Sequence, residues 1–174
     1  MMSFFRSAEA LMVQYAHYHR DRRNIATHFV GIPLIFLAIG VLLASPVWPF
    51  AGVDMTPAWL MWGITSVWYL TRGHLFLGLA TCLVNGALIS LAHDMLRAPL
   101  PWGMVAWQLG VALFVVGWVL QFIGHYFEGR KPAFVDDIVG LLVGPMFVVG
   151  EALMACGLLG RLHRAIERQA GPVR

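Results

Sequence analysis

Residues 98 to 127 read APLPWGMVAWQLGVALFVVGWVLQFIGHYF, a run of 30 residues without Asp, Glu, Lys or Arg. A helix of about 20 predominantly apolar residues spans the hydrocarbon core of a bilayer. The stretch from Phe29 to Val53 adds a second uncharged run, of 25 residues. The chain of 174 residues is 59% hydrophobic and 12% charged, about half the charged fraction of a soluble domain. We therefore expect a single all-α domain, residues 1–174, that forms a polytopic membrane helix bundle.

Apolar segments of helical length recur along the chain. Four of them are expected to cross the membrane, and they cover residues 25–48, 57–70, 74–92 and 102–124. A fifth, residues 138–159, is interrupted at Gly144-Pro145 and at Glu151, which predicts a kinked span, a re-entrant pair or two short helices. Together these segments indicate about four to six membrane helices. Residues 8–19 predict an additional amphipathic helix at the N-terminal interface.

Basic residues are distributed unevenly between the two ends of these segments. With an even number of crossings, 11 of the 12 Lys and Arg residues fall on one side and only Arg97 falls on the other. Because cytoplasmic loops are rich in Lys and Arg, we expect the basic side to be cytoplasmic, in an inner bacterial membrane or its equivalent. His93 then lies on the opposite side. Four other histidines share the cytoplasmic face: His19, His28, His74 and His125.

The first group of polar residues at this face is HYHRDRRNIATH, residues 17–28. On a helix, His17 and His19 lie about 200° apart, so only one of them can face a metal ion. His19 is nearer to the predicted helix break. Asn24 and His28 are four residues apart and share a helical face. His19 and His28 are therefore expected to converge as ligands from two helices.

The second group is QFIGHYFEGRKPAFVDD, residues 121–137. Gln121, His125 and Glu128 are spaced three or four residues apart, which places them on one helical face. Glu128 is a candidate metal ligand, orienting group or general base, and Asp136 follows in the next loop. Imidazoles combined with a carboxylate are typical of redox-active or hydrolytic metal sites. Histidine binds iron, zinc, copper and nickel, so these residues alone do not select the metal.

Two residues are weaker candidates for this site. His74 begins the third apolar segment at the same face. Glu151 lies inside an apolar segment, where a carboxylate is costly unless it faces a partner or a cavity. It is expected to pair with an arginine, to join the site, or to remain protonated and hydrogen-bonded between helices. His93 and His163 are expected to be structural or solvated.

Other functions are also compatible with these residues. A haem protein would use paired histidines as axial ligands, and a zinc-dependent lipid hydrolase would use the same three imidazoles. A non-enzymatic transporter or scaffold would bind lipid headgroups through the polar face, without a stoichiometric metal. The net charge is only +3, which indicates headgroup contact rather than nucleic-acid binding.

The two groups together resemble the integral-membrane 2-hydroxy fatty acid dioxygenases. The first matches the spacing Y-x3-H-x4-N-x3-H-x4-P between Tyr15 and Pro33, and the second is QFIGHYFEGRKPA, residues 121–133. Later positions that also look like family positions are Asp136, Pro145 and Glu151. Either group alone is a weak signal, whereas the combination covers nearly the whole chain.

The resemblance implies an α-helical membrane enzyme that binds Fe(II). Such an enzyme uses O2 to shorten a 2-hydroxy fatty acid by one carbon, a step of fatty-acid α-oxidation. Glu128 or Asp136 would orient ligands or handle the hydroxyl proton. The implied iron ligands are His19, His28 and His125, and supporting roles are expected for Tyr15, Asn24 and Gln121. The implied partners are the bilayer, O2 and the 2-hydroxy fatty acid.

Overall fold

The computed structural model describes residues 4–136 and 138–174, and most of these residues are helical. The helices are α1 (Ala8–Ala16), α2 (Arg22–Leu42), α3 (Pro57–Leu70), α4 (Leu75–Met95), α5 (Ala106–Glu128), α6 (Ala133–Asp136), α7 (Gly140–Ala155) and α8 (Gly160–Ala170). An antiparallel hairpin of β1 (Trp48–Phe50) and β2 (Val53–Met55) joins α2 to α3. A 3-10 turn, Pro101–Gly103, precedes α5. The expected all-α membrane bundle is confirmed.

Three of the described helices have the length and composition of membrane spans. They are α2, α4 and α5, with 21, 21 and 23 residues, and a fourth span results if the bent pair α7 and α8 counts as one. Four spans would reach the lower end of the expected four to six, whereas three would fall below it. Helix α3 forms at the expected residues but has only 14 of them. Its length of about 21 Å is less than the roughly 30 Å of the hydrocarbon core.

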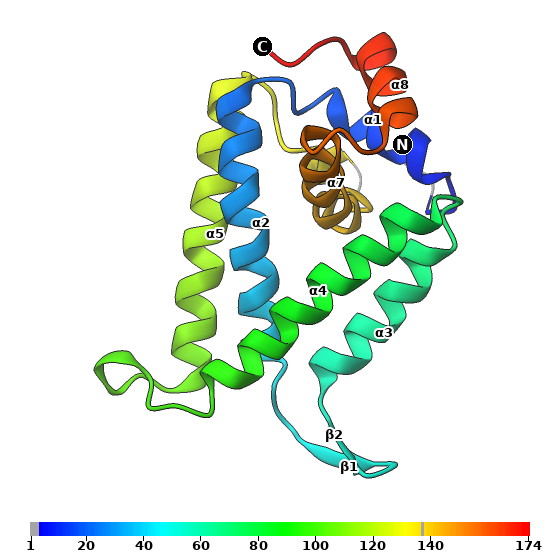
Figure 1. Ribbon diagram of the computed structural model, residues 1–174. Helices are drawn as coiled ribbons and strands as arrows, with labels where there is room; N and C mark the ends of the chain where they lie inside the picture. The colour runs from blue at the N-terminus through cyan, green and yellow to red at the C-terminus, as the bar shows by residue number, and fades with distance from the viewer. Residues whose placement is uncertain (1–3, 137) are drawn as a thin grey trace.

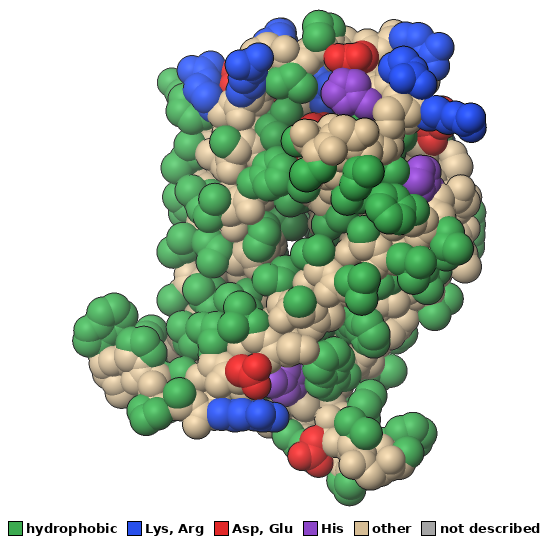
Figure 2. Space-filling model, viewed as in Figure 1, with side chains coloured by type: hydrophobic (Ala, Val, Ile, Leu, Met, Phe, Trp, Pro, Cys, Tyr) green, Lys and Arg blue, Asp and Glu red, His purple; other side chains and the backbone are tan. Residues whose placement is uncertain are grey.

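The chain runs in alternating directions through α2, α3, α4 and α5, as an even number of crossings requires (Figure 1). Helices α1, α7 and α8 and both ends of the chain therefore lie at one end of the bundle, and the hairpin lies at the other (Figure 1). Basic side chains gather at the first end (Figure 2). Arg97 follows α4 at the hairpin end and pairs with Asp94 at 3.4 Å. The predicted 11-to-1 division of basic residues is reproduced in space.

The last apolar segment differs from the expectation at its break. Helix α7 runs without interruption through Pro145 and Glu151, and the chain turns by 112° only between α7 and α8. Pro145 stands in the second turn of α7, so its missing N–H removes a single early hydrogen bond. The hydroxyl of Tyr69 donates to the carbonyl oxygen of Leu142 at 2.8 Å, which supplies a donor near this gap. Residues 138–159 therefore hold one helix, α7, and the expected interruption at Gly144-Pro145 or Glu151 is wrong; the bend lies at the end of the segment, before α8.

Helix α1 is more buried than an interfacial helix. Ser7 caps it by accepting from the N–H of Ala10 at 3.3 Å, and the helix ends at Ala16 instead of continuing to residue 19. Six of its nine residues are buried, among them Leu11 and Met12, in the cluster that also holds residues of α4, α7 and α8. The amphipathic helix at this end is α8, with an apolar face buried and an arginine-rich face exposed.

Candidate metal centre

Three buried histidines from distant parts of the chain meet at the basic end of the bundle. His19 lies in the connection between α1 and α2, His28 in the second turn of α2, and His125 in the last turn of α5. Each offers a ring nitrogen, and these three nitrogens lie within 4.8 Å of one another. The residues are 0%, 1% and 6% exposed. The structure therefore brings together the three imidazoles that were expected to converge.

The hydrogen bonds of two of these rings fix their protonation pattern. Nδ1 of His19 lies 2.8 Å from the carbonyl oxygen of Tyr15, and Nδ1 of His28 lies 2.9 Å from that of Asn24. Because a carbonyl only accepts, each Nδ1 carries the proton of its neutral ring. Both Nε2 atoms then present lone pairs, and they lie 2.9 Å apart. A cation bound by both nitrogens would relieve the repulsion between these lone pairs.

A transition-metal ion fits this geometry. Two nitrogens bound about 2.1 Å from one ion at a right angle lie about 3.0 Å apart, close to the 2.9 Å observed between the Nε2 atoms of His19 and His28. Nδ1 of His125 is buried without a hydrogen-bond partner, so a nitrogen of the third ring is also unused. Three converging imidazoles with nitrogens close enough to share one ion form a donor set that suits a transition metal.

The surroundings of His19 keep it in the form that binds metal. Its ring stacks on Tyr15, with centroids 4.1 Å apart and planes inclined by 5°, and contacts Phe147 at 5.2 Å. Burial, followed by the neighbouring His28, lowers the pKa of His19 well below its ordinary value. The ring is therefore neutral at physiological pH and retains the lone pair that coordination needs.

Glu128 links the structural elements on which the histidines lie. Its Oε2 accepts from the backbone N–H groups of Arg20 and Asp21, at 2.9 and 2.8 Å, and from Nδ2 of Asn24 at 3.0 Å. Its Oε1 accepts from Nη2 of Arg174 at 3.2 Å. The carboxylate thus ties the end of α5 to the start of α2. These contacts favour a positioning role over the general base or ligand expected from the sequence.

We expect Glu128→Ala to lower the free energy of unfolding by about 3 kcal/mol or more, because three donors at the start of α2 lose their acceptor. Thermal unfolding in detergent micelles, with bound metal measured in parallel, tests this expectation. Glu167→Ala is the matched control, since that carboxylate is 45% exposed on α8 and contacts only His163 among the described ion pairs. An unchanged melting temperature for Glu128→Ala would contradict the positioning role.

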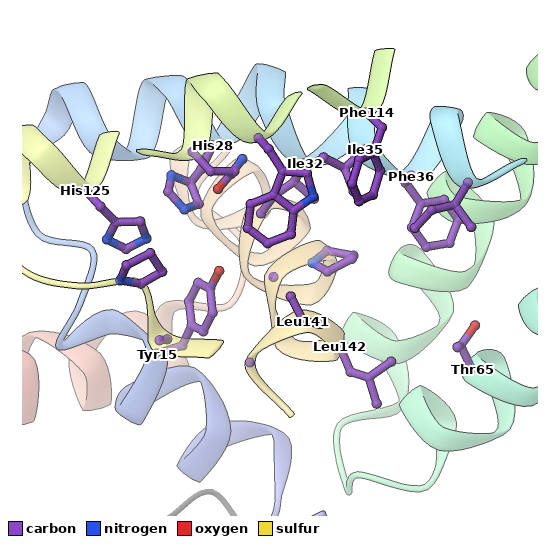
Figure 3. A pocket seen from close by; sticks show the side chains of 18 of the residues that line it. Tyr15, His28, Ile32, Ile35, Phe36, Thr65, Phe114, His125, Leu141 and Leu142 are labelled. Carbon is purple, nitrogen blue, oxygen red and sulfur yellow. The ribbon is translucent and has the colours of Figure 1, made fainter. Parts of the chain in front are cut away.

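An apolar cavity of about 260 Å³ extends from the histidines between α2, α3, α5 and α7. Tyr15, His28 and His125 line one end, and Phe36 and Thr65 line the other (Figure 3). The wall between them is formed mainly by Ile32, Ile35, Phe114, Trp118, Leu141 and Leu142. The buried polar cluster therefore stands at the end of an elongated apolar space.

Comparison with known proteins identifies the family. The family model described as 2-hydroxy-palmitic acid dioxygenase Mpo1-like matches residues 5–156. This chain belongs to the Mpo1-like family. A relative, the 2-hydroxy-palmitic acid dioxygenase MPO1 of Saccharomyces cerevisiae, is 29% identical over 159 residues, which cover 88% of this chain and 83% of the yeast protein. No solved structure matches this chain.

The supporting residues expected of an Mpo1-like protein lie around the triad. Tyr15 and Asn24 supply the carbonyl oxygens that orient His19 and His28. Asn24 also donates from Nδ2 to the carbonyl oxygen of Tyr18 at 3.0 Å. Gln121, one turn before His125, lines the cavity, and its buried Nε2 has no hydrogen-bond partner.

Other candidates lie away from the three histidines or outside the described side chains. His74 caps α4, where its Nδ1 accepts from the N–H of Leu77 at 3.3 Å. Glu151 pairs with Nη2 of Arg20 at 3.2 Å, the first of its expected alternatives. The side chain of Asp136 lies outside the described part of the structure. His17 is exposed, as expected for the spectator of its pair.

Sequence reasoning missed the importance of Arg20 and of the cavity lining. Arg20 is 4% exposed, and its guanidinium donates to Glu151 and to backbone carbonyls, including that of His19 at 2.8 Å. It helps to hold the chain around the first ligand. The signal for it was Glu151 itself, because a carboxylate in an apolar segment needs a cationic partner. The lining residues carried no local signal, since apolar side chains also face lipid.

Proposed function

We propose that this chain is an Fe(II)-dependent dioxygenase that uses O2 to shorten a 2-hydroxy fatty acid by one carbon. The observation that supports it most directly is the buried triad of His19, His28 and His125 at the end of an apolar cavity. The yeast relative is named for the same substrate class, a 2-hydroxy fatty acid. A metal site joined to an apolar channel suits a substrate with a chelating head and a long alkyl chain.

Three imidazole ligands would hold the ion and leave other coordination positions open. Fe(II), when bound, supplies electrons and a common template for O2 and the 2-hydroxy acid. The carbonyl oxygens of Tyr15 and Asn24 hold the ligating rings in orientation by accepting from their Nδ1–H groups. Gln121 lines the cavity beside the triad, and its buried Nε2 lies near Gly31 of α2. Asp136 is our candidate for moving the hydroxyl proton.

The geometry disfavours the haem alternative. Two axial nitrogens on opposite faces of a haem iron are separated by about 4 Å, twice a metal–nitrogen bond. The Nε2 atoms of His19 and His28 are only 2.9 Å apart. The ring of His125 also meets both rings edge to face, with centroid distances of 4.8 and 5.1 Å. Adjacent positions on one non-haem ion fit these contacts better than a porphyrin between the rings.

The site is proposed to face the cytoplasm. It lies at the end of the bundle where the basic residues gather (Figure 2), and membrane proteins retain such residues on the cytoplasmic side. A substrate drawn from the bilayer would then keep its alkyl chain among the helices and its carboxylate near the positively charged end.

The central test is metal analysis of anaerobically purified protein, followed by O2 uptake with 2-hydroxyhexadecanoic acid. We expect about one iron per chain from the single triad, no Soret band, and an acid product shorter by one carbon in mass spectrometry. Hexadecanoic acid, which lacks the hydroxyl, is the matched control substrate and should not be consumed. Iron-loaded protein that consumes no 2-hydroxy acid would overturn the proposal, and turnover with zinc in the absence of O2 would indicate hydrolysis.

A further inference from the structure

The cavity beside the metal centre has a single polar end. Tyr15, His28, Gln121 and His125 line it there. These polar side chains can bind the oxygens of a ligand head, which the apolar remainder of the cavity cannot do. The polar head of a ligand is therefore expected beside the histidines.

Apart from the indole N–H of Trp118, the remainder of the cavity offers little hydrogen-bonding capacity. The hydroxyl of Thr65 donates to the carbonyl oxygen of Met61 at 2.9 Å, within its own helix. The hydroxyl of Tyr69 donates to the carbonyl oxygen of Leu142 at 2.8 Å. Because both hydroxyls are already satisfied, these residues present mainly carbon to the space. An alkyl chain is the ligand that fits such a wall.

The direction and length of the space are set by α2. His28, Ile32 and Phe36 are successive turns of this helix and all line the cavity. Ile39, three residues beyond Phe36, also lines the cavity, so the space follows α2 for about 16 Å along the axis. With carbon–carbon bonds of about 1.5 Å, an extended alkyl chain advances about 1.3 Å per methylene, so this distance holds roughly 12 methylenes.

The far end is bounded by a second apolar cluster. Phe36 is buried and packs with Ala58 and Ile89, and Met61 packs against the same cluster. Thr65 stands one turn from Met61 and lines the same end, opposite the histidines (Figure 3). Phe36 and Met61 are anchored in a packed cluster, so they cannot move aside freely for additional methylenes.

We propose that Phe36, Met61 and Thr65 form a wall that selects the length of the acyl chain. The inference rests on the proposed function and adds the residues that measure the substrate. Chains that end before the wall lie wholly inside the protein, whereas longer chains must bend or leave the cavity at its end. Changing the size of the wall should therefore change which chain length is preferred.

The first test narrows the cavity with Thr65→Trp. The added ring occupies space that the last methylenes would fill. The turnover rate of a long saturated 2-hydroxy acid, divided by that of a short one, should therefore fall at least about tenfold. Ile64→Trp is the matched control, because the side chain of Ile64, which neighbours Thr65 in sequence, is 64% exposed on α3. It should leave the chain-length profile unchanged.

The second test enlarges the cavity with Phe36→Val. The space opened at the wall should raise the same long-to-short ratio, so the two variants move the profile in opposite directions. If both variants remain active and neither changes the preferred chain length, the proposed wall is wrong. If both variants instead shifted the chain-length preference in the same direction, a general change in packing would explain the shift and the proposed wall would be wrong.

A binding measurement separates this inference from the proposed function. Thermal stabilisation of the metal-free protein by the same series of 2-hydroxy acids reports chain length without turnover. If no acid is turned over but stabilisation depends on length and shifts in Thr65→Trp, the wall stands and the enzymatic proposal fails. Equal stabilisation by every chain length, unaltered by Thr65→Trp, would instead overturn the wall.

Discussion

His28→Ala is expected to abolish stoichiometric iron binding and to lower turnover of the 2-hydroxy acid by more than about 100-fold. Loss of residues that merely orient metal ligands already costs about 10- to 100-fold, and this change removes a proposed ligand itself. His28 is 1% exposed, and the variant leaves a small cavity in its place. The substitution also removes the contact between the Nε2 atoms of His19 and His28, which lie 2.9 Å apart. The metal-free variant should therefore melt within a few degrees of the metal-free parent.

The same loss is expected for His19→Ala and His125→Ala. Three histidines outside the cluster serve as matched controls: His74, His93 and His163. Their alanine variants should retain iron and activity. Iron content by mass spectrometry and the shift in melting temperature on chelation provide two independent measurements. Full iron loading in all three triad variants would show that the metal lies elsewhere.

The candidate site was largely predictable because its spacing rules are local. Asn24 and His28, or Gln121 and His125, share a face on any helix that contains them. Counting crossings then brings the start of α2 and the end of α5 to one membrane face. The role of Glu128 was not predictable in this way, since three of its donors lie more than 100 residues away in sequence.

The departures in the fold arise where tertiary packing competes with local pattern. Residues of α1 repeat at helical spacing, which suggests a surface helix, but α7 and α8 cover it and bury most of its faces. Pro145 predicts an interruption, yet it falls early in α7 and costs only one hydrogen bond there. The actual turn follows Ala155, where Gly157 and Leu159 adopt positive φ angles of 78° and 58°.

A stripe of glycines on α5 was also overlooked in the sequence. Gly110, Gly117 and Gly124 are seven residues apart, a spacing that keeps them nearly on one line along a helix. Each of them faces α2, and a Cβ added at Gly117 would lie 2.9 Å from the carbonyl oxygen of Gly31. The two helices approach closely because these positions lack side chains. This approach determines how far His28 stands from His125.

Gly117→Leu is therefore expected to separate α2 from α5 and to lower both stability and iron content. Overpacking a close contact typically costs about 1–3 kcal/mol, and backbone atoms on both sides leave little room for relaxation. Gly117→Ala should show a smaller loss in the same direction. Gly63→Leu is the control, because a Cβ added at Gly63 would meet no atom within 4 Å. Thermal unfolding in micelles and metal analysis report the two effects, and Gly117→Leu with full iron and an unchanged melting temperature would show that the helix contact does not set the site.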